Sequence, residues 1–392
     1  MKTANKYFLL LLLTIIMLVY FAKPLLVVAA ETAEPRPQAA DIELTALAAV
    51  LIDANSGRVL FEHNAHEQLP MASLTKIFTT MLVLEQVDDL SRIVTAPANF
   101  ANVGQRSLNI LPGQSFTIEE LLYANMLRSA NDASQLLGIA VSGTEAAFVE
   151  LMNQRSAELG FTNSSWRNPH GLHHNAHFTT AYEMAQISRL AGEDPVFARI
   201  AATRNYTIYR TYRANMTFSN GNRLLTEYRG ANGLKTGFTR AAGNCLAGSA
   251  ERDGLHLIAV VFNSRDTYGE IKQLLDYGFA NYSMVRTVSA GEVAVRMPVT
   301  NGRDNQVNLV YAHDIGILLP LGAEYSPEPR FEIPESIAAP IYQRNVVGRA
   351  YFDDGQGFIT AVDLLPAADI DRYTFWGVIN IAFQRVMQAL LV

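Results

Sequence analysis

Apolar positions after residue 41 follow two periodicities, which predict a mixture of strands and helices. The stretches 47–52 and 58–62 flank Asn55-Ser56-Gly57, a sequence typical of a hairpin turn. Further predicted elements are helices over 74–84, 117–127, 132–141, 144–159 and from 180, strands over 205–210, 216–219, 244–250 and 255–262, and a helix over 267–281. This order predicts an α+β fold, with an antiparallel sheet flanked by helices.

The helix predicted over 74–84 is apolar on nearly every side, since it carries Leu74, Ile77, Phe78, Met81 and Leu82. A helix of this kind belongs inside a core. The residues at its start are therefore expected to sit on a buried, rigid element.

The last third of the chain has a different pattern. From residue 285, strands predicted over 288–299, 306–319, 330–333 and 346–352 alternate with Gly, Pro and Asn, and indicate a small β-rich domain over 285–366. Residues 373–392 predict an amphipathic helix whose only charge is Arg385. Such a helix can lie at a membrane surface, although docking on the core or a full span remain alternatives.

The first thirty residues indicate export. Two lysines precede an apolar run over 7–21, and small residues precede Glu31, as in a secretory signal peptide over 1–30; an uncleaved anchor is the alternative. The mature chain then starts with a proline-containing linker, and we expect the first folded domain over 41–283. The only cysteine, Cys245, can form no intramolecular disulfide, and we interpret it as a buried structural thiol.

Charge excludes one class of function. The net charge is −6, and the sequence pI is about 5.8. Without a basic field, the chain is not expected to bind nucleic acid.

Candidate chemistry begins at Ser73 and Lys76, at the start of the apolar helix. Residues three apart share a helix face with Cβ atoms roughly 5–6 Å apart. A lysine amine can then serve as the base for a serine nucleophile. The pair alone is weak, because composition gives about one chance match in a chain of this length.

Two further motifs follow in order. Ser129-Ala130-Asn131 separates two predicted helices, where a loop can reach a cleft, and Lys235-Thr236-Gly237 lies on a predicted strand after a glycine-rich turn. A Ser-x-x-Lys, a Ser-x-Asn and a Lys-Thr-Gly in this order form a known catalytic signature.

With these motifs, and with Asn168-Pro169-His170-Gly171-Leu172 and Asp276-Tyr277-Gly278-Phe279, the chain resembles the low-molecular-mass penicillin-binding proteins of the D-alanyl-D-alanine carboxypeptidase family, serine peptidase family S11. The resemblance implies a β-lactamase/transpeptidase-like catalytic domain that needs no cofactor or metal. It implies removal of the terminal D-alanine from peptidoglycan stem pentapeptides, with β-lactam antibiotics as inhibitors, at the extracytoplasmic face of the bacterial membrane.

The resemblance also implies roles for individual residues. Ser73 would be the acylated nucleophile and Lys76 its base, while Ser129 would relay a proton to the leaving D-alanine and Asn131 would bind the substrate peptide. A free lysine titrates near 10.4, so lowering the pKa of Lys76 to about 7 takes roughly 4–5 kcal/mol. Burial and a nearby cation, which Lys235 would supply, both act in that direction.

On the predicted strand that carries Lys235-Thr236-Gly237, the resemblance implies a carboxylate-binding site. Lys235 and Thr236 would hold the terminal carboxylate, and Gly237 would let the substrate lie along the strand edge. The backbone N–H groups of Ser73 and Phe238 would form the oxyanion hole, which contributes roughly 3–4 kcal/mol in such enzymes.

Several alternatives stay open. A β-lactamase of the related fold would need a deacylating carboxylate, which the segment 168–172 lacks, and a non-catalytic cell-wall-binding protein would not need the reactive side chains. Arg265 is equally consistent with carboxylate binding and with a solvated helix start. Four histidines have pairwise helical spacing that would suit zinc on a helix, but Pro169 and Gly171 predict a loop, so we expect packing or solvated roles: His170, His173, His174 and His177.

Overall fold

The computed structural model describes residues 42–373, apart from 102, 210–213, 324, 326, 356 and 358, together with 379, 383 and 387. The predicted signal peptide over 1–30 lies outside the described residues. So does the predicted helix over 373–392, except for Tyr373 and three isolated positions.

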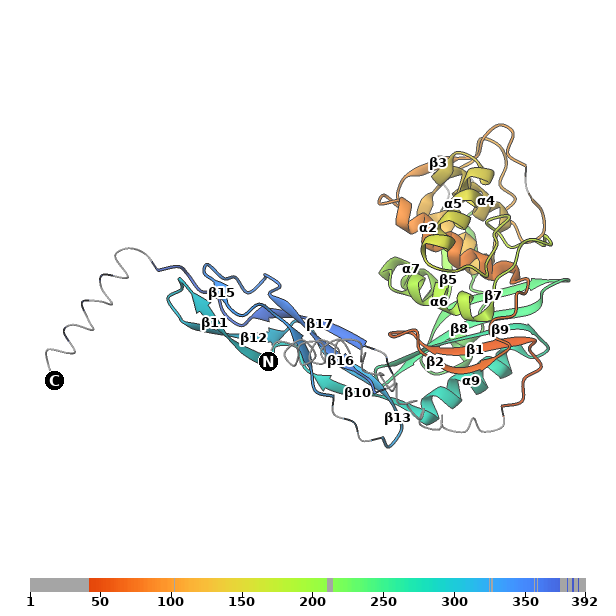
Figure 1. Ribbon diagram of the computed structural model, residues 1–392. Coiled ribbons are helices and arrows are strands. Elements are labelled where there is room, and N and C mark those ends of the chain that lie inside the picture. Colours follow the sequence, from red (N-terminus) through yellow and green to blue (C-terminus); the bar gives the residue numbers. More distant parts are fainter. Residues whose placement is uncertain are drawn as a thin grey trace, which may run out of the picture. The chain divides into compact units, whose positions relative to one another are not determined.

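A five-stranded antiparallel sheet forms the centre of the first domain, in the order β2-β1-β9-β8-β7 (Figure 1). Its strands are β1 (Ala48–Asp53), β2 (Val59–His63), β7 (Ala231–Thr239), β8 (Gly243–Arg252) and β9 (Leu255–Ser264). The predicted hairpin is confirmed, since Ile52 pairs with Val59 across the turn. Strands β1 and β2 thus share a sheet with β7, β8 and β9, which follow more than 150 residues later in the chain.

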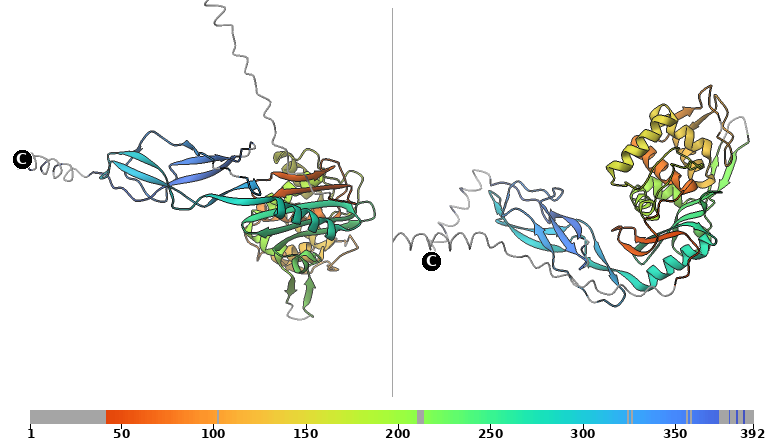
Figure 2. Two further views of the ribbon diagram at one scale, coloured as in Figure 1. Left: turned by 90° about the horizontal axis from the view of Figure 1, so that it is seen from below. Right: turned by 45° about the vertical axis from the view of Figure 1, so that its right-hand side comes forward.

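Helices cover both faces of this sheet, and alternate side chains along a strand pack into different apolar clusters. In β1, Ala48, Val50 and Ile52 pack into one apolar cluster, whereas Ala49 and Leu51 pack into the other. The second cluster lies under α9 (Thr267–Asn281), which crosses the face of the sheet in Figure 2. The period-two alternation of a strand therefore distributes the side chains of β1 between two layers.

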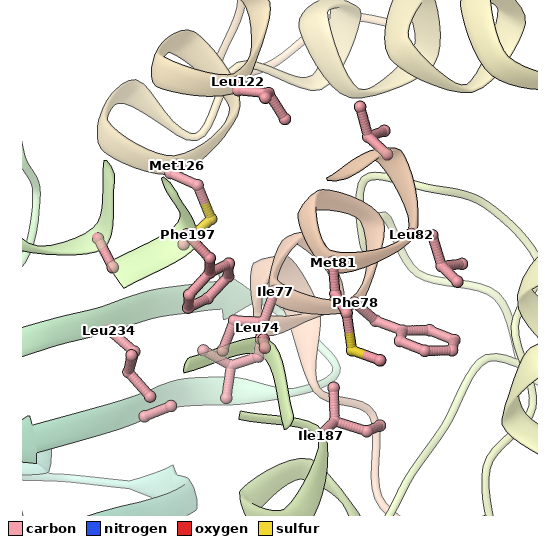
Figure 3. Packing of buried hydrophobic residues seen from close by; sticks show 14 of the residues in the cluster. Leu74, Ile77, Phe78, Met81, Leu82, Leu122, Met126, Ile187, Phe197 and Leu234 are labelled. Carbon is pink, nitrogen blue, oxygen red and sulfur yellow. The ribbon is translucent and has the colours of Figure 1, made fainter. Parts of the chain in front are cut away.

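A helical block covers the other face (Figure 1). It comprises α2 (Thr75–Gln86), α3 (Ile118–Tyr123), α4 (Asn131–Ser142), α5 (Glu145–Glu158), α6 (Ala181–Gly192) and α7 (Pro195–Ala202). The side chains of α2 meet apolar neighbours on several sides in Figure 3, including Leu122, Ile187 and Phe197 from other helices and Leu234 from β7. The predicted burial of this helix is confirmed.

Short elements complete the domain. They are a 3-10 turn η1 (Ala72–Leu74), a π-helical turn η2 (Ala124–Arg128), the helix α8 (Leu224–Glu227), and two hairpins, β3 (Ile93–Thr95) with β4 (Ser115–Thr117) and β5 (Asn205–Ile208) with β6 (Met216–Ser219). The capping box at Thr117 is present, with reciprocal hydrogen bonds to Glu120. The predicted helix over 117–127 is in fact α3 followed by η2, which places Ser129 in a left-handed conformation at its end.

The predicted β-rich region has its own core. A six-stranded sheet has the order β14-β16-β17-β12-β11-β15, and β10 pairs with β13. The strands are β10 (Tyr282–Val288), β11 (Val293–Thr300), β12 (Gln306–Tyr311), β13 (Ile315–Pro320), β14 (Arg330–Glu332), β15 (Ile337–Ala338), β16 (Gly348–Asp353) and β17 (Ile359–Pro366). The stretch predicted as one strand over 306–319 is two strands. Strand β10 follows α9 directly and spans the boundary expected between 283 and 285.

Within the part of the chain that the structure describes, no single helix has the length and apolarity of a membrane span. The bent pair α4 and α5 meets that test by length and composition alone.

Candidate active site

The nucleophile candidate Ser73 lies in the turn η1, immediately before α2. Its neighbour Ala72 has a φ of +49°, in the left-handed region that residues with a β-carbon seldom adopt. The turn is supported by a chain of hydrogen bonds, in which Thr75 Oγ1 donates to Ala72 O (2.8 Å) and lies 2.8 Å from His177 Nε2. Because His177 Nδ1 accepts from Arg167 N (2.9 Å), the ring proton is on Nε2 and points to Thr75.

Gly171 packs directly against η1, the turn that carries Ser73, which we call the nucleophile turn. Its φ is +85°, and a β-carbon there would lie only 1.9 Å from Ala72 O and 2.9 Å from Ser73 N. The loop 168–172 can approach the nucleophile only because residue 171 is glycine.

Lys76 is completely buried, one helical turn from Ser73. Its Nζ lies 3.2 Å from Ser73 Oγ, 2.8 Å from Asn131 Oδ1 and 2.5 Å from His170 O. The amide oxygen of Asn131 and the carbonyl of His170 can only accept hydrogen bonds. When the amine is neutral, these two acceptors take both of its N–H groups, and its lone pair is left for the Ser73 hydroxyl.

Electrostatics favour the neutral amine. Burial is the largest cause that lowers the pKa of Lys76 well below its usual value, followed by the charges of Lys235 and Arg106, while Asp132 acts in the opposite direction. Burial also lowers the pKa of Lys235, to about 7, with Arg106 as the second cause. The expected contribution of Lys235 to the field at Lys76 is present, but Arg106 was not predicted from the sequence.

The loop 129–131 reaches the same site. Asn131 binds Lys76 as described and lies at the start of α4. The hydroxyl of Ser129 is buried and has no hydrogen-bond partner among the described residues, yet Ser129 lines the cleft. A hydroxyl without a described partner is thus available in the cleft that Ser73 also lines.

The third motif lies on β7, as predicted. A β-carbon at Gly237 would lie 3.0 Å from Met71 O and 3.1 Å from Ser73 N, so the strand runs close beside the nucleophile turn. Lys235 is buried and donates to Thr236 O (3.1 Å), while Phe238 is 62% exposed.

These segments enclose a cleft of about 330 Å³. Its described lining contains no Asp or Glu and includes six predicted site residues: Ser73, Ser129, Asn131, Thr236, Gly237 and Phe238. The structure therefore brings the three motifs together. Lining residues that the sequence did not indicate include Gln105, Arg106, Gly221 and Tyr268. No motif marks them, because they come from loops and, for Tyr268, from the start of α9, which meet only in the folded chain.

Cys245 and Arg265 are placed as follows. Cys245 is buried on β8 opposite Gly237, and burial raises the pKa of its thiol to about 12, as suits a structural thiol. The backbone N–H of Arg265 donates to Thr45 Oγ1 (2.9 Å), and Arg265 is absent from the residues that line the described cleft.

Of the four histidines, two are buried and two are exposed. His170 and His177 pack within the site loop, whereas His173 and His174 are exposed. Among the described residues, no three His, Cys, Asp or Glu side chains are grouped so as to hold a metal.

A serine hydroxyl beside a buried lysine, a second hydroxyl and a strand edge with a Lys-Thr-Gly sequence define a class, the serine enzymes that use a Ser-x-x-Lys pair. Comparison with known proteins gives the family. The model for peptidase S11, D-alanyl-D-alanine carboxypeptidase, matches residues 31–266, and that for the C-terminal domain of penicillin-binding protein 5 matches residues 282–372. The chain belongs to the D-alanyl-D-alanine carboxypeptidase family of low-molecular-mass penicillin-binding proteins.

Relatives of known activity match most of the chain. D-alanyl-D-alanine carboxypeptidase DacF of Bacillus subtilis is 30% identical over 311 residues, which cover 77% of this chain and 80% of the relative. D-alanyl-D-alanine carboxypeptidase DacC of Escherichia coli is 29% identical over 344 residues, which cover 84% and 85%.

Solved structures agree with the predicted fold class. Penicillin-binding protein 5 of Haemophilus influenzae matches with a TM-score of 0.64 and 27% identity over 84% of this chain and 98% of that chain. Penicillin-binding protein 3 of Streptococcus pneumoniae matches with a TM-score of 0.73 and 25% identity over 84% and 100%. The α+β, β-lactamase/transpeptidase-like fold with a β-rich C-terminal domain is confirmed.

Proposed function

We propose that this protein is a serine-type D-Ala-D-Ala carboxypeptidase that removes the terminal D-alanine from peptidoglycan stem pentapeptides and is acylated by β-lactams. The observation that carries the proposal is the buried Lys76 amine at 3.2 Å from Ser73 Oγ, in a cleft closed by the other two motifs. Membership of the carboxypeptidase family supports the substrate.

In the first half-reaction, Ser73 Oγ attacks the carbonyl carbon of the penultimate D-alanine as its proton passes to Lys76. The oxyanion is bound by the backbone N–H groups of Ser73 and Phe238. The C–N bond then breaks, and Ser129, whose hydroxyl has no partner among described residues, passes a proton to the leaving amine. Proton transfer of this kind contributes about 10²–10⁴-fold in rate.

In the second half-reaction, water replaces the D-alanine and hydrolyses the Ser73 ester. Asn131 orients both Lys76 and the peptide, since its Oδ1 accepts from Nζ. Lys235 and Thr236 hold the terminal carboxylate, and Gly237 leaves the strand edge open to the substrate. No carboxylate lines the described cleft to speed deacylation of a bound penicillin, which disfavours the β-lactamase alternative.

We also propose the following division of the chain: signal peptide 1–30, catalytic domain 41–283, β-rich domain 285–366, and membrane-surface helix 373–392. Three positions of the last segment that the structure describes, Ile379, Phe383 and Met387, are apolar, exposed and four residues apart. That spacing presents one apolar helix face, as a helix at the extracytoplasmic membrane surface requires.

The test is to incubate the purified protein with a labelled penicillin and with a pentapeptide that ends in D-Ala-D-Ala. We expect a long-lived penicilloyl adduct on Ser73, found by peptide mapping, and release of one D-alanine per pentapeptide. Ser73→Ala should lose both. Release of D-alanine by that variant, or rapid turnover of penicillin by the wild type, would contradict the proposal.

A further inference from the structure

Arg106 contributes a positive charge to the cleft without a partner of its own. It lines the cleft, and its guanidinium makes no hydrogen bond or ion pair with another residue that the structure describes. Its positive charge lowers the pKa of both Lys76 and Lys235, because a nearby like charge disfavours their protonated forms. A guanidinium without a partner among the described residues, in a cleft whose described lining contains no carboxylate, forms a site for an anion.

The backbone of Arg106 is held firmly by the start of α4. Asn131 N donates to Arg106 O (2.8 Å), and Asn131 Nδ2 donates to Gly104 O (3.2 Å). The buried Asp132 accepts from Ser107 Oγ (2.6 Å), which fixes the next residue of the loop. The loop that carries the guanidinium is therefore tied to Asn131 of the Ser-x-Asn motif and to Asp132, which follows the motif.

Because residue 221 is a glycine, no side chain fills the space between the guanidinium of Arg106 and the hydroxyl of Thr236. A β-carbon at 221 would lie 3.6 Å from Thr236 Oγ1 and 3.9 Å from Arg106 Nη1. The hydroxyl and the guanidinium thus approach one small space from two sides. A carboxylate in that space would meet a hydroxyl donor on one side and an arginine fork on the other.

We propose that Arg106 binds the terminal carboxylate of the substrate, together with Thr236, in the space above Gly221. The inference rests on the proposed carboxypeptidase function and adds a specificity-determining residue to it. A guanidinium binds a carboxylate through two parallel hydrogen bonds, which a lysine ammonium cannot reproduce. Arg106 therefore selects substrates with a free terminal carboxylate over neutral ones.

The experiment measures the rate of Ser73 acylation by benzylpenicillin, which carries a free carboxylate, and by its methyl ester, which does not. Mass spectrometry follows both reactions in the wild type, Arg106→Gln, Arg106→Lys and the control Arg229→Gln, an exposed arginine outside the cleft lining. We expect Arg106→Gln to lose at least tenfold with the acid and less than threefold with the ester. Arg106→Lys should be intermediate, and Arg229→Gln should match the wild type.

An equal loss with acid and ester, or no loss with the acid, would overturn the role of Arg106. A wild type that does not prefer the acid would overturn it as well. If the wild type forms no adduct on Ser73 with either compound, the proposed function itself fails, so the two failures are distinguishable.

Gly221→Ala gives a second, independent variant. The φ of Gly221 is not positive, and the added methyl would make only ordinary contacts, so the fold should be unchanged. The methyl would fill the carboxylate space, and we expect acylation by benzylpenicillin to fall at least fivefold with an unaltered melting temperature. A normal rate in this variant would show that the carboxylate lies elsewhere.

Discussion

At the scale of single residues, the proposed mechanism requires two lysines that differ in charge. In this mechanism Lys76 is neutral, so that it can accept the proton of Ser73, and Lys235 is protonated, so that it attracts a carboxylate. Burial lowers the pKa of both, but Lys76 is also affected by the charge of Lys235. The pair therefore sets a pH window for activity.

We predict a bell-shaped dependence of kcat/KM on pH for D-alanine release. Activity should rise as Lys76 loses its proton, and fall above about pH 7 as Lys235 loses its own. Arginine stays protonated at these pH values, so Lys235→Arg should lose the alkaline limb while it keeps the acid limb. An unchanged alkaline limb in that variant would exclude Lys235 as its origin.

His177 links the site to stability. Burial lowers its pKa to about 3, compared with 6.5 for a free histidine. Below pH 6.5 the unfolded chain binds this proton and the folded chain does not, so the free energy of unfolding decreases as the pH is lowered toward 3. From pH 6.5 to pH 4 the loss due to this group is roughly 3 kcal/mol.

The prediction is tested by denaturant unfolding at several pH values. His177→Gln, whose side-chain amide does not titrate, should show a shallower decline of stability than the wild type between pH 6.5 and 4. Parallel curves for the two proteins would contradict it.

At the scale of elements, the nucleophile turn and the loop 168–172 are one unit. The turn η1 supplies a left-handed Ala72, and Gly171 allows the loop to pack on its carbonyl. Neither segment forms this arrangement alone, because the contact joins residues about 100 positions apart.

We predict that Gly171→Ala will be destabilised by at least about 2 kcal/mol and will not be acylated, since it combines a positive φ with a backbone clash. Gly160→Ala is the matched control, because Gly160 also has a positive φ (+80°) but nothing within 4 Å of the added carbon. It should lose only about 1 kcal/mol and keep full acylation. Equal losses in the two variants, measured by urea unfolding, would refute the packing argument.

At the scale of the whole molecule, the two domains have separate apolar cores, two clusters in the first and one in the β-rich domain. The sheet and helical block position the site, whereas the β-rich domain has a separate apolar cluster that includes Leu309, Phe352 and Leu364. No residue of that cluster lines the active-site cleft. Changes beyond residue 372 should therefore leave the chemistry intact.

We predict that deletion of residues 373–392 abolishes binding to anionic phospholipid vesicles and leaves Ser73 acylation within about twofold of the wild type. A triple substitution of Ile379, Phe383 and Met387 by Gln, which removes the exposed apolar positions only, should give the same result. Vesicle flotation measures the binding. Full binding by the triple variant would place the contact elsewhere.

The sequence alone was sufficient to find most elements and the motifs that meet in the cleft. Ser73, Lys76, Asn131 and the strand with Lys235 were predicted because reactive side chains at fixed spacing on periodic elements are local features. The buried helix α2 and the α+β class were predicted for the same reason. Boundaries were less accurate where local signals conflict, as in the π-helical turn before Ser129.

Residue types and their order along the chain were enough to identify the family and the motifs that meet in the cleft, because both are local features of the sequence. The groups that surround these motifs became known only from the folded chain. Arg106, Gly221, Gly171 and His177 enter the site through contacts between distant loops, and such contacts leave no periodic signal. The effect of the Arg106 charge on the pKa of Lys76 belongs to this group, since the charges that surround a buried amine are a property of the folded chain.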